Sequence, residues 1–104
     1  MENLTALEEL MMNYNQIDSI SDWIGNLRKL RLLRCTKNNL TYVSEKIGNL
    51  KNLKEIEFEE NNLSSLPMKI GNLESLQVCR LGRNPPILSN NVCEIFKDYS
   101  NPIS

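Results

Sequence analysis

An asparagine recurs every 23 residues in this chain and stands each time at the same place in the same apolar pattern. The four asparagines are Asn15, Asn38, Asn61 and Asn84. The apolar pattern around them begins at Leu4, Leu27, Leu50 and Leu73. A fixed period of about 20 to 50 residues is typical of repeat architectures, in which each copy buries its apolar face only against its neighbours. The sequence therefore predicts a solenoid of stacked coils.

Each copy predicts one short strand. In the third copy, Ile56 and Phe58 alternate with glutamates, which is the period of a strand with one buried face. Equivalent strands joined by long crossovers stack as parallel neighbours about 4.8 Å apart. We therefore expect Leu53, Ile56 and Phe58 to meet their counterparts from the flanking copies in one shared core.

The residues after each strand fit the turns of such a coil. An asparagine amide both donates and accepts hydrogen bonds, so the four recurring asparagines predict a polar ladder along the stack. Gly25, Gly48 and Gly71 recur on the opposite side of the coil and predict either a positive φ or a close approach between coils. Pro67 predicts the start of a short helical or 3-10 turn.

Residues 63–76, LSSLPMKIGNLESL, resemble the intracellular Ras-group type of leucine-rich-repeat protein, whose 23-residue repeat carries LPxxIGxL on its convex side. The resemblance covers the chain from Leu4 to Asn84. It implies an α/β fold, a right-handed solenoid with short parallel strands on the concave face and turns with short 3-10 or helical segments on the convex face.

We expect one domain over residues 1–104, with repeats at 4–26, 27–49, 50–72 and 73–86. Residues 87–104 predict a C-terminal helical cap, because Val92, Ile95, Phe96 and Tyr99 recur at helical spacing. Phe96 also keeps the 23-residue phase with Leu73. No comparable cap precedes the first repeat, which leaves two alternatives: the chain is a fragment of a longer array, which we favour, or its uncapped N-terminal end self-associates.

Composition limits the partners and the compartment. The net charge of −1 gives no overall field that would attract nucleic acid or an anionic membrane. No stretch approaches the roughly 20 apolar residues of a spanning helix, and the first residues, MENLTALEEL, lack the basic start of a signal peptide. The sequence therefore predicts a cytoplasmic protein.

Cysteine positions agree with that prediction. Cys35 and Cys79 fall at inward strand positions and are expected to be small buried hydrophobes. They lie two copies apart, about 10 Å, which exceeds the Cα reach of about 7 Å for a disulfide. Secreted relatives of the resembling family carry cysteine-clustered caps, which Cys93 alone does not form.

Strand side chains that point away from the core form the concave face, the usual binding surface of a solenoid. The predicted partner-binding residues are Met11, Tyr14, Leu32, Arg34, Lys37, Glu55, Glu57, Glu59, Glu60, Arg80 and Arg83. Tyr14 is the strongest single candidate for an apolar anchor.

The third copy is acidic on this face and its neighbours are basic, which has two compatible explanations. The structural one is pairing across adjacent strands, within the set Arg34, Glu57 and Arg80 and within the set Lys37, Glu60 and Arg83. The functional one is a partner of complementary charge. Both stay open at the level of sequence.

Catalysis has little support. The chain has no histidine, which excludes histidine-based triads and histidine metal sites, and it has no glycine-rich phosphate loop. Glu57 and Glu59 share a strand face, but solvation and nearby arginine keep such carboxylates ionised. We therefore predict no enzyme activity, no cofactor and no metal site.

The sequence predicts a non-enzymatic protein-binding module, a scaffold or regulator in intracellular signalling. The resemblance implies protein partners such as a small GTPase, a phosphatase or a kinase. The alternative is a recognition segment of a larger multidomain signalling enzyme, a kinase or phosphatase, whose catalytic domain lies elsewhere.

Overall fold

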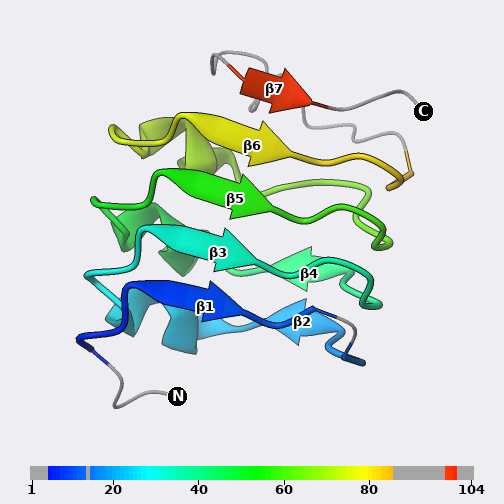
Figure 1. The fold of residues 1–104 in the computed structure, drawn as a ribbon, viewed down its shortest axis with the longest axis horizontal. Helices are drawn as coiled ribbons and strands as arrows, with labels where there is room; N and C mark the ends of the chain where they lie inside the picture. Colours follow the sequence, from blue (N-terminus) through cyan, green and yellow to red (C-terminus); the bar gives the residue numbers. More distant parts are fainter. Residues whose placement is uncertain (1–4, 14, 86–97, 101–104) are drawn as a thin grey trace.

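The computed structural model describes residues 5–13, 15–85 and 98–100. Within them the chain winds into stacked coils, and each coil lays a short strand beside the strand of the coil before it (Figure 1). These strands form one parallel sheet in the order β1-β3-β5-β6-β7. Their bounds are β1 Glu9–Met11, β3 Leu32–Arg34, β5 Glu55–Glu57, β6 Val78–Arg80 and β7 Asp98–Ser100. The predicted parallel solenoid is therefore confirmed.

The strands from β1 to β6 keep the 23-residue register of the sequence. Leu10 pairs with Leu33, Leu33 with Ile56, and Ile56 with Cys79. Successive side chains of a strand point to opposite faces of the sheet, so equivalent residues of successive copies line up in columns. Columns that point inward fill the core, and those that point outward form a continuous surface.

A second layer lies behind this sheet. It contains the two-stranded parallel sheet of β2 (Ser19–Ile20) and β4 (Tyr42–Val43), and three 3-10 helices. The helices are η1 Asp22–Asn26, η2 Glu45–Asn49 and η3 Met68–Asn72. Ser44 caps η2, since its hydroxyl accepts a hydrogen bond from the Lys46 N–H at 3.0 Å. Pro67 holds the same position before η3 with φ −65°, so the prediction that it begins a 3-10 turn is confirmed.

One apolar core fills the space between the two layers and runs from Leu10 to Leu81. Leu53, Ile56 and Phe58 each have 0% exposed surface and belong to this cluster with their counterparts from the flanking copies. Burial of an apolar side chain of this size contributes roughly 1.5–3 kcal/mol. Because each copy supplies only a few such residues, no copy has a core without its neighbours.

The glycines act through close approach rather than through backbone conformation. No described glycine has a positive φ, so that part of the prediction is wrong. A Cβ on Gly48 would lie 2.8 Å from the Lys69 Cβ, and one on Gly25 would lie 3.0 Å from the Lys46 Cβ. Gly71 would meet nothing within 4 Å. The bare backbone of a glycine thus lets η2 stack closely on η1, and η3 on η2.

Positive φ occurs instead at the residue before each of three ladder asparagines. Lys37 has φ 57°, Glu60 has φ 60° and Arg83 has φ 60°. Residues with a Cβ pay about 1–2 kcal/mol for this left-handed conformation. The same turn nevertheless recurs in three copies, because it aims the asparagine that follows toward the preceding coil.

Most of the predicted helical cap at 87–104 lies outside the described residues, including Val92, Ile95 and Phe96. The part that is described, Asp98–Ser100, is strand β7, so the helical prediction is wrong there. β7 pairs with β6 and thereby satisfies backbone groups at that edge of the sheet. Asp98 pairs with Val78, which is 20 residues earlier, so this pairing departs from the 23-residue phase.

The two inward cysteines differ in chemistry. Cys35 is a free, fully buried thiol, and its burial raises its pKa to about 11. Cys79 is also fully buried but takes part in a disulfide, so its prediction as a simple buried hydrophobe is wrong. Cys79 does not bond to Cys35, as their spacing predicts, and the disulfide partner of Cys79 lies outside the described residues.

Candidate partner-binding face

The outward side chains of the large sheet form a face that we call the concave face. Two columns cross it on the strands, and the register places their members beside one another. The first column contains Glu9, Leu32, Glu55 and Val78. The second contains Met11, Arg34, Glu57 and Arg80.

The concave face combines exposed and half-buried side chains. Met11 is 51% exposed, and Lys37 and Arg83 are also exposed. The half-buried residues are Leu32, Arg34, Glu55, Glu57, Glu59, Glu60 and Arg80. Tyr14, the strongest apolar candidate in the sequence, lies outside the described residues.

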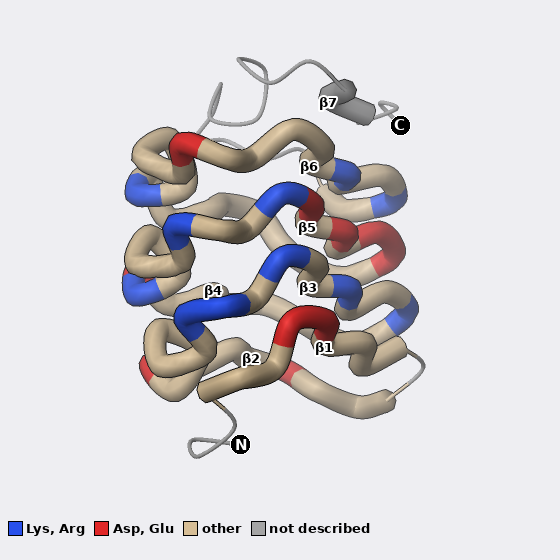
Figure 2. The backbone as a smooth tube through the Cα atoms, turned by 60° about the vertical axis from the view of Figure 1, so that its left-hand side comes forward, with Lys and Arg blue, Asp and Glu red and all other residues tan. Residues whose placement is uncertain are grey.

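Charge alternates from strand to strand across this face. Figure 2 shows acidic residues on and after β5 between basic residues on β3 and β6. Arg34 and Glu57 form a bidentate ion pair. Arg34 Nε donates to Glu57 Oε1 at 2.9 Å, and Arg34 Nη2 donates to Glu57 Oε2 at 3.3 Å. Arg34 Nη1 also lies 3.6 Å from the Met11 sulfur. Arg34 therefore links three neighbouring strands, and the pairing predicted for Arg34 and Glu57 exists.

The ion pair changes the protonation chemistry of the face. Its hydrogen bond to Glu57 raises the pKa of Arg34. Burial raises the pKa of Glu57, but hydrogen bonds with Glu55 and Arg34 outweigh it and the net pKa is lowered. The hydrogen bond with Glu57 raises the pKa of Glu55. Of the two neighbouring carboxylates on β5, Glu57 is thus the more firmly ionised.

The pairing predicted between Glu60 and Arg83 at the strand exits is absent from the residues that the structure describes. Among the residues that the structure describes, no ion pair forms between Glu60 and Arg83, and the carboxylate of Glu59 has no partner either. Glu59, Glu60 and Arg83 stand where the chain turns after β5 and β6, and the backbone is left-handed at Glu60 and Arg83. These charges are therefore available to a partner.

A groove of about 400 Å³ lies beside these carboxylates. Its lining residues are Arg34, Thr36, Lys37, Glu57, Glu59, Glu60, Gly82 and Arg83. Gly82 occupies the position of Thr36 and Glu59 in its own copy, so no side chain fills that place. The predicted partner-binding residues did not include Thr36 or Gly82. Both stand in the 23-residue phase of Glu59, and this phase could have placed them on the face.

Two polar contacts on the first strands were also missed. Arg31 Nε lies 3.2 Å from Glu8 Oε1, and Arg31 Nη2 lies 3.7 Å from Glu9 Oε2. Asn13 Oδ1 accepts hydrogen bonds from the N–H and hydroxyl of Thr36 at 3.0 and 2.9 Å. A search for opposite charges one period apart would have found the Arg31 pair with Glu8.

The asparagine ladder bonds each copy to the one before it. Asn61 Oδ1 accepts from the Leu40 N–H at 3.0 Å, and its Nδ2 donates to the Cys35 carbonyl at 2.7 Å. Asn38 makes the equivalent bonds to the first copy, and Asn84 makes them to the third copy. Asn15 departs from the prediction, since its described side-chain bond goes only to the nearby Asn13 carbonyl at 3.2 Å. The residues that the structure describes include no coil before the first, to which Asn15 could bond.

Metal sites and membrane spans are absent from the same residues. The described part of the chain contains no group of three or more histidine, cysteine, aspartate or glutamate side chains that could hold a metal ion. In residues 5–13, 15–85 and 98–100, no helix is both long and apolar enough to cross a membrane.

Several solved structures have the same fold. A leucine-rich-repeat protein of Leptospira interrogans is 34% identical, with a TM-score of 0.76 over 79% of this chain. The internalin inlF of Listeria monocytogenes is 27% identical, with a TM-score of 0.79 over 99% of this chain. Internalin C2 of the same species is 21% identical and shares the fold, with a TM-score of 0.78 over 94% of this chain.

The chain spans 21%, 31% and 42% of the lengths of these three proteins, in that order. No protein-family model and no curated protein sequence matches it.

Proposed function

Because this chain is a leucine-rich-repeat protein, we propose that it is a protein-binding module that docks a partner on its concave face and catalyses no reaction. The observation that carries the proposal is the set of charged side chains at the strand exits that have no partner within the described chain. Glu59, Glu60 and Arg83 line one groove, and none of them forms an ion pair with another residue that the structure describes. Such charges are free to steer and orient an approaching protein.

The other residues of the concave face have distinct roles in this proposal. The Arg34 and Glu57 pair is already satisfied within the chain, so it holds the face rigid rather than supplying new contacts. Met11 and Leu32 supply apolar contact beside it, and Lys37, Glu55 and Arg80 complete the charged surface. Exposed charges change association rates more than they change affinity, whereas apolar anchors contribute most of the binding free energy.

The test uses variants that leave the internal pairs intact. We expect Glu59→Arg combined with Glu60→Arg to reduce recovery of the partner from a native extract, and to do so most at low salt. Glu74→Arg is the matched control, because Glu74 is exposed in the turn before β6, outside the strand columns. A photo-crosslinking residue at Met11 locates the bound protein directly. Equal recovery with all variants, combined with a crosslink only from a convex position such as Lys69 on η3, would refute docking on the concave face.

We also propose a role as a scaffold or regulator in intracellular signalling, with a small GTPase, a phosphatase or a kinase as the class of partner. This part rests on the resemblance of residues 63–76 to the intracellular repeat type. The alternative, a recognition segment of a larger signalling enzyme, stays a prediction, as do a fragment of a longer array and self-association at the N-terminal end. Identifying the crosslinked protein and reading the genomic sequence around the gene test these points.

The compartment is the point at which structure and sequence disagree. A cytoplasmic location follows from the sequence, but the disulfide at Cys79 favours an oxidising compartment. Thiol labelling of protein that has been acid-quenched from its native source, in denaturant and without reductant, decides between them. Three labelled cysteines per chain support the cytoplasm, whereas Cys35 alone supports the disulfide and refutes the cytoplasmic proposal.

A further inference from the structure

In the second layer of the solenoid, the sheet of β2 and β4 does not continue into the third copy. β4 bonds to β2, where the Thr41 N–H donates to the Asp18 carbonyl at 2.9 Å and the Ser44 N–H donates to the Ile20 carbonyl at 2.8 Å. One period later the donors would be Ser64 and Pro67. Within the described chain Ser64 makes no such bond, and a proline has no N–H to give. β4 is therefore the edge of a two-stranded sheet.

Pro67 removes a second donor as well. In the copy before, the Ser44 hydroxyl donates to Asp22 Oδ1 at 2.5 Å. Glu45 stands one period after Asp22, and Pro67 stands one period after Ser44, so Glu45 lacks the corresponding hydroxyl. Among the described residues no hydrogen bond or ion pair satisfies the Glu45 carboxylate. A single substitution in the repeat thus leaves both a backbone edge and a charge without their usual partners.

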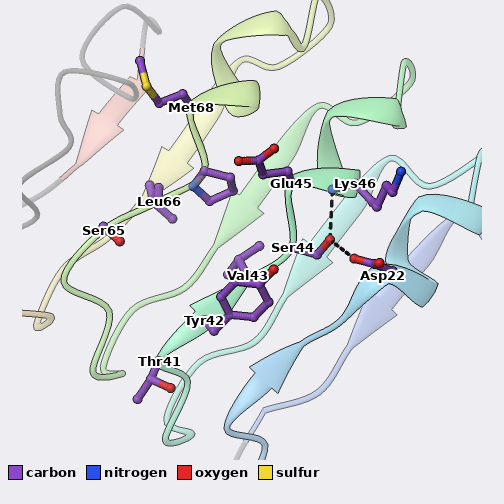
Figure 3. Close-up of a pocket in the computed structure, with 11 residues that line it drawn as sticks. Asp22, Thr41, Tyr42, Val43, Ser44, Glu45, Lys46, Ser65, Leu66 and Met68 are labelled. Atoms are coloured by element: carbon purple, nitrogen blue, oxygen red, sulfur yellow. Dashed lines mark hydrogen bonds between the residues drawn. The ribbon is translucent and has the colours of Figure 1, made fainter.

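A cleft opens at this place. It measures about 490 Å³, and Figure 3 shows most of its lining on two coils, with Thr41 to Lys46 on one and Ser65, Leu66 and Met68 on the next, while Asp22 contributes from the coil before. Tyr42 is 54% exposed and Met68 is 76% exposed, the two largest exposures among the described apolar side chains of this size. The cleft therefore combines a strand edge, apolar side chains, the Glu45 carboxylate and the basic Lys46, whose side chain points away from Glu45 in Figure 3.

We propose that this cleft, lined by residues 41–46 and 65–68, binds an extended segment of a partner polypeptide that carries a basic side chain. The backbone N–H groups of the segment would meet the carbonyls of Thr41 and Val43, as an added strand does at a sheet edge. Its lysine or arginine would pair with Glu45, and its apolar side chains would contact Tyr42 and Met68. This site is separate from the concave face.

The test titrates the full chain with a blocked peptide, acetyl-Val-Thr-Val-Lys-Val-Thr-amide, to about 1 mM while backbone NMR shifts are recorded. We expect saturable shifts at Thr41 to Lys46 and at Met68. A peptide with norleucine in place of lysine is the control for the charge, and it should bind about tenfold more weakly. Glu45→Gln should remove that difference between the two peptides, whereas Glu60→Gln on the concave face should leave it unchanged.

Pro67→Ser is the decisive variant, because it restores the backbone N–H and the side-chain hydroxyl that are missing at position 67. We expect it to close the ladder onto β4, to show slow hydrogen exchange at the amide that the substitution introduces, and to weaken the lysine peptide at least tenfold. Unchanged binding by a folded Pro67→Ser protein overturns the proposal. So do shifts confined to Glu57–Glu60, which would support the concave face instead. Shifts at Thr41 to Val43 that depend on protein concentration alone would show a second copy on this edge and would also overturn it.

Discussion

Replacing Asn61 by alanine tests what holds successive coils together. The Asn61 side chain is nearly buried, at 7% exposed, and serves groups in the preceding coil. Its removal leaves the Leu40 N–H and the Cys35 carbonyl without these hydrogen-bond partners. The Phe58 carbonyl keeps a bond at 2.9 Å, because Asn84 also donates to it. The loss therefore falls on two backbone groups.

An unsatisfied buried backbone group costs about 1–3 kcal/mol. For two such groups we expect Asn61→Ala to lower the free energy of unfolding by about 2–6 kcal/mol. A domain of this size has roughly 5–15 kcal/mol in total. One amide therefore accounts for a large share of the stability.

The assay is urea unfolding followed by far-UV circular dichroism, and in parallel by fluorescence of Trp23, which packs partly buried against the core. Asn62→Ala is the matched control, since Asn62 is the exposed neighbour and should change stability by no more than about 0.5 kcal/mol. Hydrogen exchange at the Leu40 amide gives a local measure and should accelerate in Asn61→Ala. If the two variants unfold within about 0.5 kcal/mol of each other, the ladder does not hold the coils and the reasoning fails.

Three further predictions concern the backbone and the charged pair. Gly48→Ala should destabilise the protein by about 1–3 kcal/mol, because its Cβ would lie 2.8 Å from Lys69, whereas Gly71→Ala should be nearly neutral; thermal unfolding compares them. Glu60→Gly should stabilise by about 0.5–1 kcal/mol in the same assay, because it relieves the left-handed backbone, and a loss would contradict this. The pKa of Glu57 is lowered on folding, so the ionised Glu57 stabilises the folded protein above pH 4.5, its ordinary pKa. This contribution is lost as the pH falls through the pKa of Glu57 in the folded protein. The pKa of Glu55 is raised, so its effect has the opposite sign: wild-type stability relative to Glu55→Gln should fall as the pH rises above 4.5, and a flat difference would contradict the assignment.

The repeat period predicted the fold because it determines which residues of successive copies lie beside one another. Once Ile56 and Phe58 are placed on an inward face, parallel neighbours at a 23-residue offset follow, and Leu33, Ile56 and Cys79 pair as expected. The period also placed the columns of the concave face. It predicted the pair of Arg34 and Glu57, but not that Glu60 and Arg83 would stay apart, because that depends on where the chain turns after each strand.

Departures from the repeat were harder to predict than the repeat itself. The left-handed turn at Glu60 had no sequence mark, because the residue there is neither glycine nor asparagine. Pro67 was read as the start of a turn, but its effect on β4 required knowledge of which carbonyl its missing N–H would have met. The strand at Asp98–Ser100 falls outside the period, so no counterpart in the repeats pointed to it.

The ladder bonds all point one way, from the side chain of one copy to the backbone of the copy before it. The two ends of the stack are therefore not equivalent under truncation. Within the ladder, trimming from the amino end leaves only a side-chain amide without its partners, and water solvates such an amide readily, as at Asn15. Trimming from the carboxyl end removes the asparagine whose amide bonds the backbone of the preceding copy. That copy then keeps backbone N–H and carbonyl groups without these partners. Loss of order should accordingly travel backward through the array, from the last coil toward the first.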